Sequence, residues 1–230
     1  PIHLPPIEAG RLLGTCVKNA IVKTRRDRMY IEREKKYLVD ENLARKLIEK
    51  SVARIGVVQW YLDTCSFDIE KGMTNYRIRY TIDESGNEEW VRAFKSTLIE
   101  DFTRHEEESK IEISADMFET LTFKPVVAKI RYYLLYEPAE VVLDEFIELD
   151  KPYRVPVKYI AEVETQEPFE EYERMFDLYT PLSLEEFERY INKNFAVESK
   201  LSPREIIDIV SEKLKKSKQK QLKHNWSDSQ

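Results

Sequence analysis

Two carboxylates and an ammonium group alternate along one short stretch of the sequence. If residues 30–39 form a strand, Glu32, Glu34 and Lys36 share one face, because successive side chains of a strand point to opposite sides. Charge also lies on the other face, whereas an ordinary strand of an antiparallel sheet keeps one face apolar. We interpret this row as part of a site for a charged ligand.

Several later segments repeat the pattern of charged side chains two residues apart. Within one segment the charges tend to have one sign, whereas faces exposed to solvent would mix acids and bases at random. The cationic residues are Arg77 and Arg79, Lys95, and Lys129 and Arg131; Glu162 and Glu164 are anionic; Asp144 is a single acid; Arg104, Glu106 and Glu108 share one mixed face.

For any one of these segments, the simplest explanation is an amphipathic strand with its charges in water. The repetition favours another arrangement, a closed barrel whose charged faces line the interior. Such an interior must hold water and a ligand, because unpaired buried charge is too costly. Converging Arg and Lys side chains suit a polyphosphate. Carboxylates beside a polyphosphate need a divalent cation between them, and Mg²⁺ and Mn²⁺ prefer oxygen ligands.

The elements that would position these side chains are short and mostly β. The alternation predicts eight strands, separated by turn signals, at 30–39, 56–64, 74–82, 89–97, 103–113, 126–136, 140–149 and 157–165. Eight short strands at this spacing are typical of a sandwich or a closed barrel. Two helices interrupt them, one after an N-cap at Asp40 and one near Ser114, with Met117, Phe118 and Leu121 facing inward.

After Thr165 the apolar spacing becomes helical. It predicts helices over 168–179, 182–196 and 202–220, the last with Ser202 as N-cap and Pro203 at the first helical position. The polar, basic end of the chain is expected to fray.

Composition excludes several classes of function. The net charge of −6 argues against a general nucleic-acid coat, and the 5 glycines form no phosphate-binding Gly-rich loop. Cys16 and Cys65 do not form a CxxC pair, so we expect reduced thiols. No apolar run reaches membrane-spanning length and no signal-peptide pattern begins the chain. We therefore expect a cytoplasmic protein that does not bind membranes.

The ordered set of motifs resembles the CYTH superfamily, the triphosphate tunnel metalloenzymes. Glu32-Arg-Glu34-Lys-Lys36 fits the ExExK signature, and QWYLDT, RIR, FKST, RHEEE, KIRYY, VLDEF and AEVE follow in the expected order. The resemblance covers roughly residues 30–196. It implies an α+β fold with an eight-stranded antiparallel closed β-barrel and flanking helices. The corresponding division of the chain is an N-terminal extension at 1–29, a tunnel domain at 30–199, and a C-terminal helix and basic tail at 200–230.

The resemblance also implies roles for individual residues, with Mg²⁺ or Mn²⁺ as cofactor. Glu32, Glu34, Glu162 and Glu164 would bind the metal. Glu106, Glu108 and Asp144 would complete the acidic side as ligands or water-positioning groups, and with Lys36 they are the predicted catalytic residues. The predicted triphosphate-binding residues are Lys36, Arg77, Arg79, Lys95, Arg104, Lys129 and Arg131.

These residues predict an enzyme, a metal-dependent triphosphatase that hydrolyses an inorganic, nucleoside or other organic triphosphate. Inorganic triphosphate is the least demanding substrate, because every recognised group addresses phosphate. Nucleic acid is not expected as a partner, except through a 5′-triphosphate end. The chain is expected to be a monomer or a homodimer.

Three alternatives remain. One is a class IV adenylyl cyclase, although the early His-Phe motif typical of those enzymes is absent. The second is a non-catalytic sensor of nucleotide or polyphosphate. The third is a β-rich interaction protein whose charged strands are solvated. If the charges instead face an interior, removing one cation such as Lys36 is expected to stabilise the ligand-free protein, because like charges repel in an empty tunnel.

Overall fold

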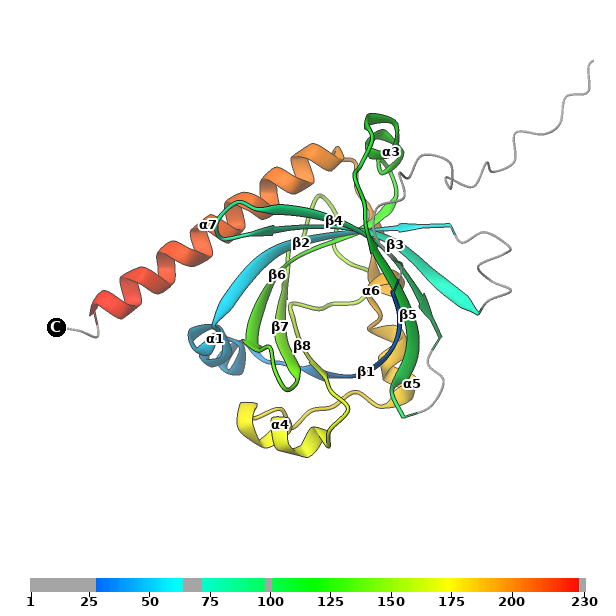
Figure 1. Ribbon diagram of the computed structural model, residues 1–230. Coiled ribbons are helices and arrows are strands. Elements are labelled where there is room, and N and C mark those ends of the chain that lie inside the picture. Colours follow the sequence, from blue (N-terminus) through cyan, green and yellow to red (C-terminus); the bar gives the residue numbers. More distant parts are fainter. Residues whose placement is uncertain (1–27, 64–71, 98–100, 228–230) are drawn as a thin grey trace, which may run out of the picture.

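Eight antiparallel strands close into a barrel in the computed structural model, which describes residues 28–63, 72–97 and 101–227. The order around the barrel is β2-β3-β4-β5-β1-β8-β7-β6, and pairing between β2 and β6 closes it (Figure 1). The predicted closed antiparallel barrel with flanking helices and all eight predicted strands are therefore confirmed. The strands are β1 (Arg28–Leu38), β2 (Ala53–Leu62), β3 (Met73–Asp83), β4 (Glu88–Ser96), β5 (Thr103–Lys110), β6 (Pro125–Leu135), β7 (Glu140–Phe146) and β8 (Tyr159–Glu164).

The apolar faces of the strands point out of the barrel, and the charged faces point in. On β6, Val126, Ala128 and Ile130 join the main hydrophobic cluster on the outside. Lys129 and Arg131 alternate with them and face the interior. The barrel therefore buries its hydrophobic surface between strands and helices rather than at its centre.

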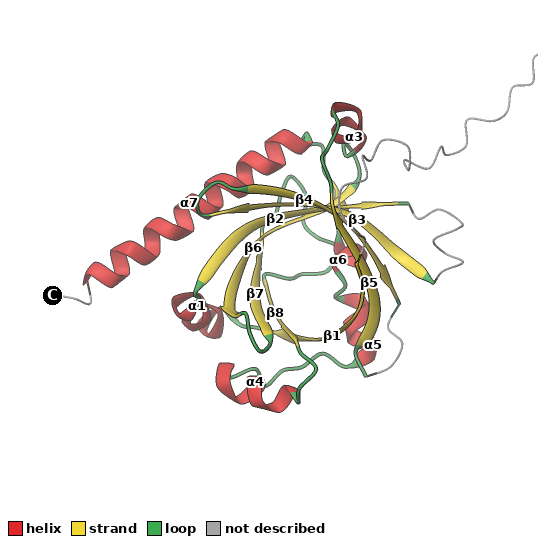
Figure 2. Cartoon of the chain, in the orientation of Figure 1, coloured by secondary structure: helices red, strands yellow, loops and turns green. Residues whose placement is uncertain are grey.

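Helices cover parts of this apolar outer surface, as Figure 2 shows. None of the helices within the described ranges is long and apolar enough to cross a membrane. The helices are α1 (Glu41–Lys50), α3 (Ala115–Thr120), α4 (Phe169–Phe176), α5 (Leu184–Arg189), α6 (Asn192–Phe195) and α7 (Pro203–Ser227), and the short strand β9 (Val197–Glu198) pairs with β6.

Side-chain caps begin three of these helices where the sequence predicts them. Asp40 accepts a hydrogen bond from the backbone N–H of Leu43, and Ser114 accepts one from that of Met117. At α7, the backbone N–H of Glu205 donates to the Ser202 hydroxyl, and the Glu205 carboxylate accepts from the backbone N–H of Ser202. Met117 and Leu121 are buried as expected, whereas Phe118 is only partly buried.

The long C-terminal helix α7 packs against the outside of β2 and β6. Its residues Ile206, Val210 and Leu214 belong to the main hydrophobic cluster. The approach to β2 is close at Gly56, where a Cβ would lie 2.5 Å from Cγ1 of Val210. The helix continues to Ser227, seven residues beyond the predicted end at 220. Lys, Gln and Leu in this end have high helix propensity.

The predicted helix over 182–196 is wrong in one respect, because it breaks between α5 and α6. Ile191 adopts an extended backbone with φ −65° and ψ 129°. The break turns α6 toward the barrel interior, where Asn192 donates a hydrogen bond to Gln59 and Phe195 packs on Phe146. These two tertiary contacts outweigh the local preference of the segment for one continuous helix.

An apolar cluster fills one end of the barrel interior. Val127, Phe146 and Ile160 lie on the inner faces of their strands and pack with Phe195 and Ala196 from α6 and the residue after it. Figure 1 shows α6 behind the barrel opening, consistent with a closed end. The charged part of the interior therefore opens toward the other end.

Residues 1–27 of the predicted extension at 1–29 lie outside the described residues, and Cys16 is among them. Cys65 also lies outside the described residues.

Candidate functional site

The charged faces of the strands line one cavity of about 270 Å³ inside the barrel. It contains every predicted site residue except Asp144. The numbers of cations and carboxylates in the lining are nearly equal, so most charges can find a partner of opposite sign. The cations are Lys36, Arg77, Arg79, Lys95, Arg104, Lys129 and Arg131; the carboxylates are Glu32, Glu34, Glu89, Glu106, Glu108, Glu140, Glu162 and Glu164.

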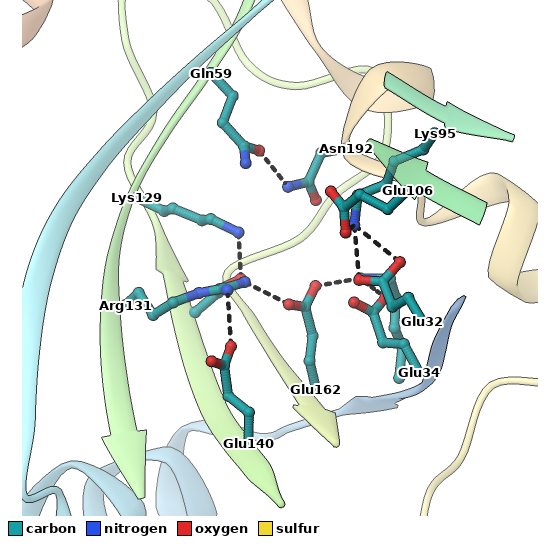
Figure 3. Close-up of polar contacts among 12 residues, drawn as sticks. Glu32, Glu34, Gln59, Lys95, Glu106, Lys129, Arg131, Glu140, Glu162 and Asn192 are labelled. Atoms are coloured by element: carbon teal, nitrogen blue, oxygen red, sulfur yellow. Dashed lines mark hydrogen bonds and ion pairs between the residues drawn. The ribbon is translucent and has the colours of Figure 1, made fainter. Parts of the chain in front are cut away.

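The three charged residues that β1 contributes lie deep in this cavity. Glu32 pairs with Lys95 Nζ at 2.7 Å and with Arg104. Glu34 pairs with Lys36 Nζ at 2.9 Å and with Arg104 Nη2 at 3.3 Å. Strand pairing sets these contacts, because Glu32 lies opposite Arg104 on β5. Figure 3 shows Glu32, Lys95 and Glu106 pointing toward one another.

Arg77 and Arg79 form a second group on β3 and reach across β4 to carboxylates of β5. Arg77 Nη2 lies 3.0 Å from Glu106 and 3.4 Å from Glu108, and Arg79 Nη2 lies 3.1 Å from Glu108. The Nε atoms of both arginines are buried without a hydrogen-bond partner among the described residues. Buried donors are normally paired, so these two N–H groups are available to a ligand in the cavity.

A third group surrounds Asp144, which has no exposed surface. Arg131 donates two hydrogen bonds to its two carboxylate oxygens, each 2.8 Å long, and Lys129 pairs with it as well. Arg131 also pairs with Glu162, which in turn pairs with Lys36. Asp144 therefore lies behind two cations of the lining and holds them in place, rather than lining the cavity as predicted for a ligand or water-positioning group.

Burial and ion pairing act in opposite directions on the pKa values of these groups. Burial alone would raise the pKa of Glu32, but Lys95 and Arg104 outweigh it and hold that pKa below its ordinary value. The same competition lowers the pKa of Glu108 to about 2, through Arg79 and Arg77. For Lys129, burial and neighbouring Arg131 win over Asp144 and lower the pKa to about 8. Glu32 and Glu108 are therefore ionised at neutral pH.

Glu164 is the exception among the predicted metal ligands. It lies opposite Glu34 on β1 and opposite Glu140 on β7, so three carboxylates face one another across neighbouring strands. No hydrogen bond or ion pair to its carboxylate is found within the described ranges. Burial, Glu32 and Glu34 raise the pKa of Glu164 to about 8. Like charges directly opposite destabilise a sheet, so below about pH 8 a proton on Glu164 relieves this row, and a bound cation in its place would do the same.

The chemistry of these carboxylates fits Mg²⁺ or Mn²⁺, both of which take oxygen ligands. The described residues contain no preassembled group of three acidic, His or Cys side chains for a metal. The reason lies in the ion pairs, since Glu32, Glu34 and Glu162 are each held by Lys or Arg. A metal at these carboxylates would have to compete with those cations for the same oxygen atoms.

Sequence reasoning missed several lining residues. Glu140 lies on the same face as Asp144, four residues away, so strand alternation could have identified it. Gln59 and Tyr61 likewise lie two residues apart on the inner face of β2. The Tyr61 hydroxyl and the Asn192 amide both donate a hydrogen bond to the Gln59 side-chain oxygen. Asn192 carries no comparable signal, because only the break before α6 places it there (Figure 3).

The barrel is similar to solved structures of low sequence identity. One protein, from Pyrococcus horikoshii, is 20% identical, with a TM-score of 0.45 over 65% of this chain and 89% of that chain. Another, from Bacillus halodurans and provisionally described as an adenylate cyclase, is 17% identical, with a TM-score of 0.47 over 71% and 98%. An inorganic triphosphatase is 23% identical, with a TM-score of 0.39 over 73% and 95%. No protein-family model and no curated protein matches the chain. The likeness is one of fold and adds nothing on what the cavity binds.

The ion pairs reverse the expected effect of removing one cation from the ligand-free protein. Lys36 lies between Glu34 and Glu162, so Lys36→Met leaves buried carboxylates with one partner fewer. We expect the free energy of unfolding to fall by about 3 kcal/mol, since breaking a buried pair costs about 3–5 kcal/mol and Arg104 and Arg131 remain nearby. Chemical denaturation measures the change. Lys158→Met, which removes an exposed pair with Glu41, is the control and should change little. An increase in the free energy of unfolding for Lys36→Met would instead support the expectation that like charges repel in the empty cavity.

The raised pKa of Glu164 predicts a pH dependence of stability in the metal-free protein. The folded protein keeps a proton on Glu164 up to about pH 8, whereas the unfolded chain releases it near the ordinary value of 4.5. The stability associated with this proton is complete below about pH 4.5 and is lost as the pH rises through 8. Glu164→Gln mimics the protonated form, so its melting temperature should increasingly exceed that of the wild type between pH 5 and pH 8. A constant difference across this range would contradict the assignment.

Proposed function

We propose that the chain hydrolyses a triphosphate inside the barrel cavity with the help of Mg²⁺ or Mn²⁺. The observation that carries this proposal is the convergence of the seven Lys and Arg side chains of the lining on one cavity of about 270 Å³. So many buried cations suit a compact ligand with several negative charges on many oxygen atoms. A triphosphate has both properties, and Arg can bind its oxygens in bidentate fashion.

Binding would proceed by exchange of partners. In the ligand-free protein Lys36 and Arg131 pair with Glu162, and Lys95 and Arg104 pair with Glu32. Phosphate oxygens can replace these carboxylates as acceptors, so the cations need not be desolvated again. The free Nε–H groups of Arg77 and Arg79 supply further donors. Side chains already held in position lose little conformational entropy on binding.

The same exchange would release the carboxylates that could hold a metal. Glu32, Glu34, Glu162 and Glu164 are the residues we assign to it. A bound divalent cation would shield these carboxylates from the phosphate oxygens and lower the pKa of a water molecule toward neutrality. Glu106 and Glu108 orient Arg77 and Arg79, and Asp144 orients Lys129 and Arg131. No serine, cysteine or histidine nucleophile is required.

A second candidate function is a sensor that binds a polyphosphate without cleaving it. One specific observation favours it: three of the four proposed metal ligands already pair with Lys or Arg. A sensor needs the cations, but it gains little from Glu164, whose carboxylate lies opposite two others. Because Glu164 is costly without a cation, we favour the enzyme.

Phosphate release from inorganic triphosphate, ATP, thiamine triphosphate and 5′-triphosphorylated RNA tests the proposal. We expect release from at least one of them with Mg²⁺ or Mn²⁺ and none with a chelator. Glu32→Gln should lower the rate about 10- to 100-fold, because removing a group that orients or binds a catalytic metal has effects of this order. Arg79→Met should raise KM, because it removes donors to the phosphate oxygens.

Glu41→Gln and Lys158→Met are matched controls, since they remove a carboxylate and a cation from an exposed pair outside the cavity. Both should hydrolyse at the wild-type rate. Tight triphosphate binding without release, under every metal, would support the sensor. If Glu32→Gln and Arg79→Met both keep triphosphate binding and phosphate release, both functions are overturned. Formation of pyrophosphate with a cyclic nucleotide would replace hydrolysis by the cyclase reaction.

A further inference from the structure

Two tyrosine rings stack where the cavity meets the surface. The rings of Tyr133 and Tyr136 are nearly parallel, with centroids 4.4 Å apart and an angle of 13° between planes. Tyr133 lines the cavity, whereas Tyr136 follows the end of β6 and is 51% exposed. The pair therefore connects the charged interior with the exterior. Nothing in the triphosphate chemistry described above uses it.

The pair lies at the open end of the barrel. On β6 the inner face runs from Val127, in the apolar cluster that closes one end, through Lys129 and Arg131 to Tyr133. Tyr133 is thus the residue farthest from the closed end in this row. The neighbouring turn between β6 and β7 lies at the rim of the barrel in Figure 1.

The phosphate-binding cations lie inward of the tyrosines. Arg131 shares the inner face of β6 with Tyr133, two residues away, and side chains at this spacing are neighbours along a strand. A triphosphate that occupies the cations would leave its outer end, with whatever group it carries, beside Tyr133. An inorganic triphosphate carries no such group and would leave both rings unused.

We propose that the Tyr133–Tyr136 pair is a stacking site for the base of a nucleoside triphosphate, and that the cavity prefers such a substrate to inorganic triphosphate. This inference rests on the proposed function of the cavity and names its substrate class. Aromatic side chains stack on bases of any sequence, because each base presents a π-face. No sequence pattern indicates a base-binding group, since Tyr133 and Tyr136, two of the three tyrosines in KIRYYLLY, read as ordinary strand residues.

The charge at the rim supports a discrete organic group over a longer polyphosphate. Glu89 and Glu140 line the cavity, pair with Lys110 and with Arg131, and keep 41% and 38% of their side-chain surface accessible, so each retains carboxylate surface for a ligand. Carboxylates here would repel further phosphate groups. They can accept hydrogen bonds from the exocyclic amino groups of a base. The rim therefore combines stacking surface with acceptors.

The test compares ATP, ribose 5-triphosphate and inorganic triphosphate as probes of the full chain. Tyr136→Ala removes the exposed ring, Tyr136→Phe keeps it, and Tyr179→Ala removes another exposed tyrosine, which does not line the cavity. Steady-state kinetics give KM for each compound, and calorimetry gives the affinity for a non-hydrolysable ATP analogue and for imidotriphosphate. We expect Tyr136→Ala to raise KM and the dissociation constant about tenfold for ATP and its analogue only, in keeping with base–aromatic stacking.

Tyr136→Phe and Tyr179→Ala should behave like the wild type with all compounds. Equal effects of Tyr136→Ala on ATP and on the two base-free compounds, or no effect on any, would overturn the inference while leaving the proposed function intact. Tyr136-dependent binding of the ATP analogue without hydrolysis of any compound would support the stacking site and overturn the proposed function. Failure of every compound to bind would overturn both.

Discussion

The need to pair buried charge governs this structure. The interior of the barrel holds Lys and Arg beside Glu, and almost none of these side chains could remain ionised there alone. Each of Glu32, Glu34 and Glu162 is shared between two cations, so the charges form a connected network rather than isolated pairs. Such a network contributes little net stability, because the pairing mainly offsets the cost of burial. What it provides is an interior that is already charged, positioned and able to exchange one anion for another.

This interior is possible only because the hydrophobic core lies elsewhere. The outer faces of the strands pack against helices, above all α7, and an apolar cluster around Phe146 and Phe195 closes one end. Burial of this apolar surface supplies the favourable free energy of folding that the interior does not. The cavity can therefore remain polar and open at the other end, where Glu140 and the stacked tyrosines lie.

Strand alternation made the barrel and most of the site predictable. The two-residue period of a strand places Glu32, Glu34 and Lys36 on one face, independently of the rest of the chain. Eight such strands can share one interior only if the sheet closes into a barrel. Depth could not be predicted, since Asp144 has the same periodicity as Glu140 but lies behind Lys129 and Arg131. The break before α6 and the stacking of Tyr136 on Tyr133 depend on tertiary contacts that no local pattern encodes. The ion pairs themselves were also missed, because partners come from strands far apart in the sequence.

On our proposal, cations of the interior leave their carboxylates to bind a triphosphate. A crystal structure with imidotriphosphate and Mn²⁺ tests it most directly, because anomalous scattering locates the metal independently. We expect phosphate oxygens on Lys36, Arg77 and Arg131, the Lys36–Glu162 pair broken, and Mn²⁺ bound by carboxylates that include Glu164. Ion pairs unchanged from the ligand-free arrangement, with the triphosphate outside the barrel, would contradict the account.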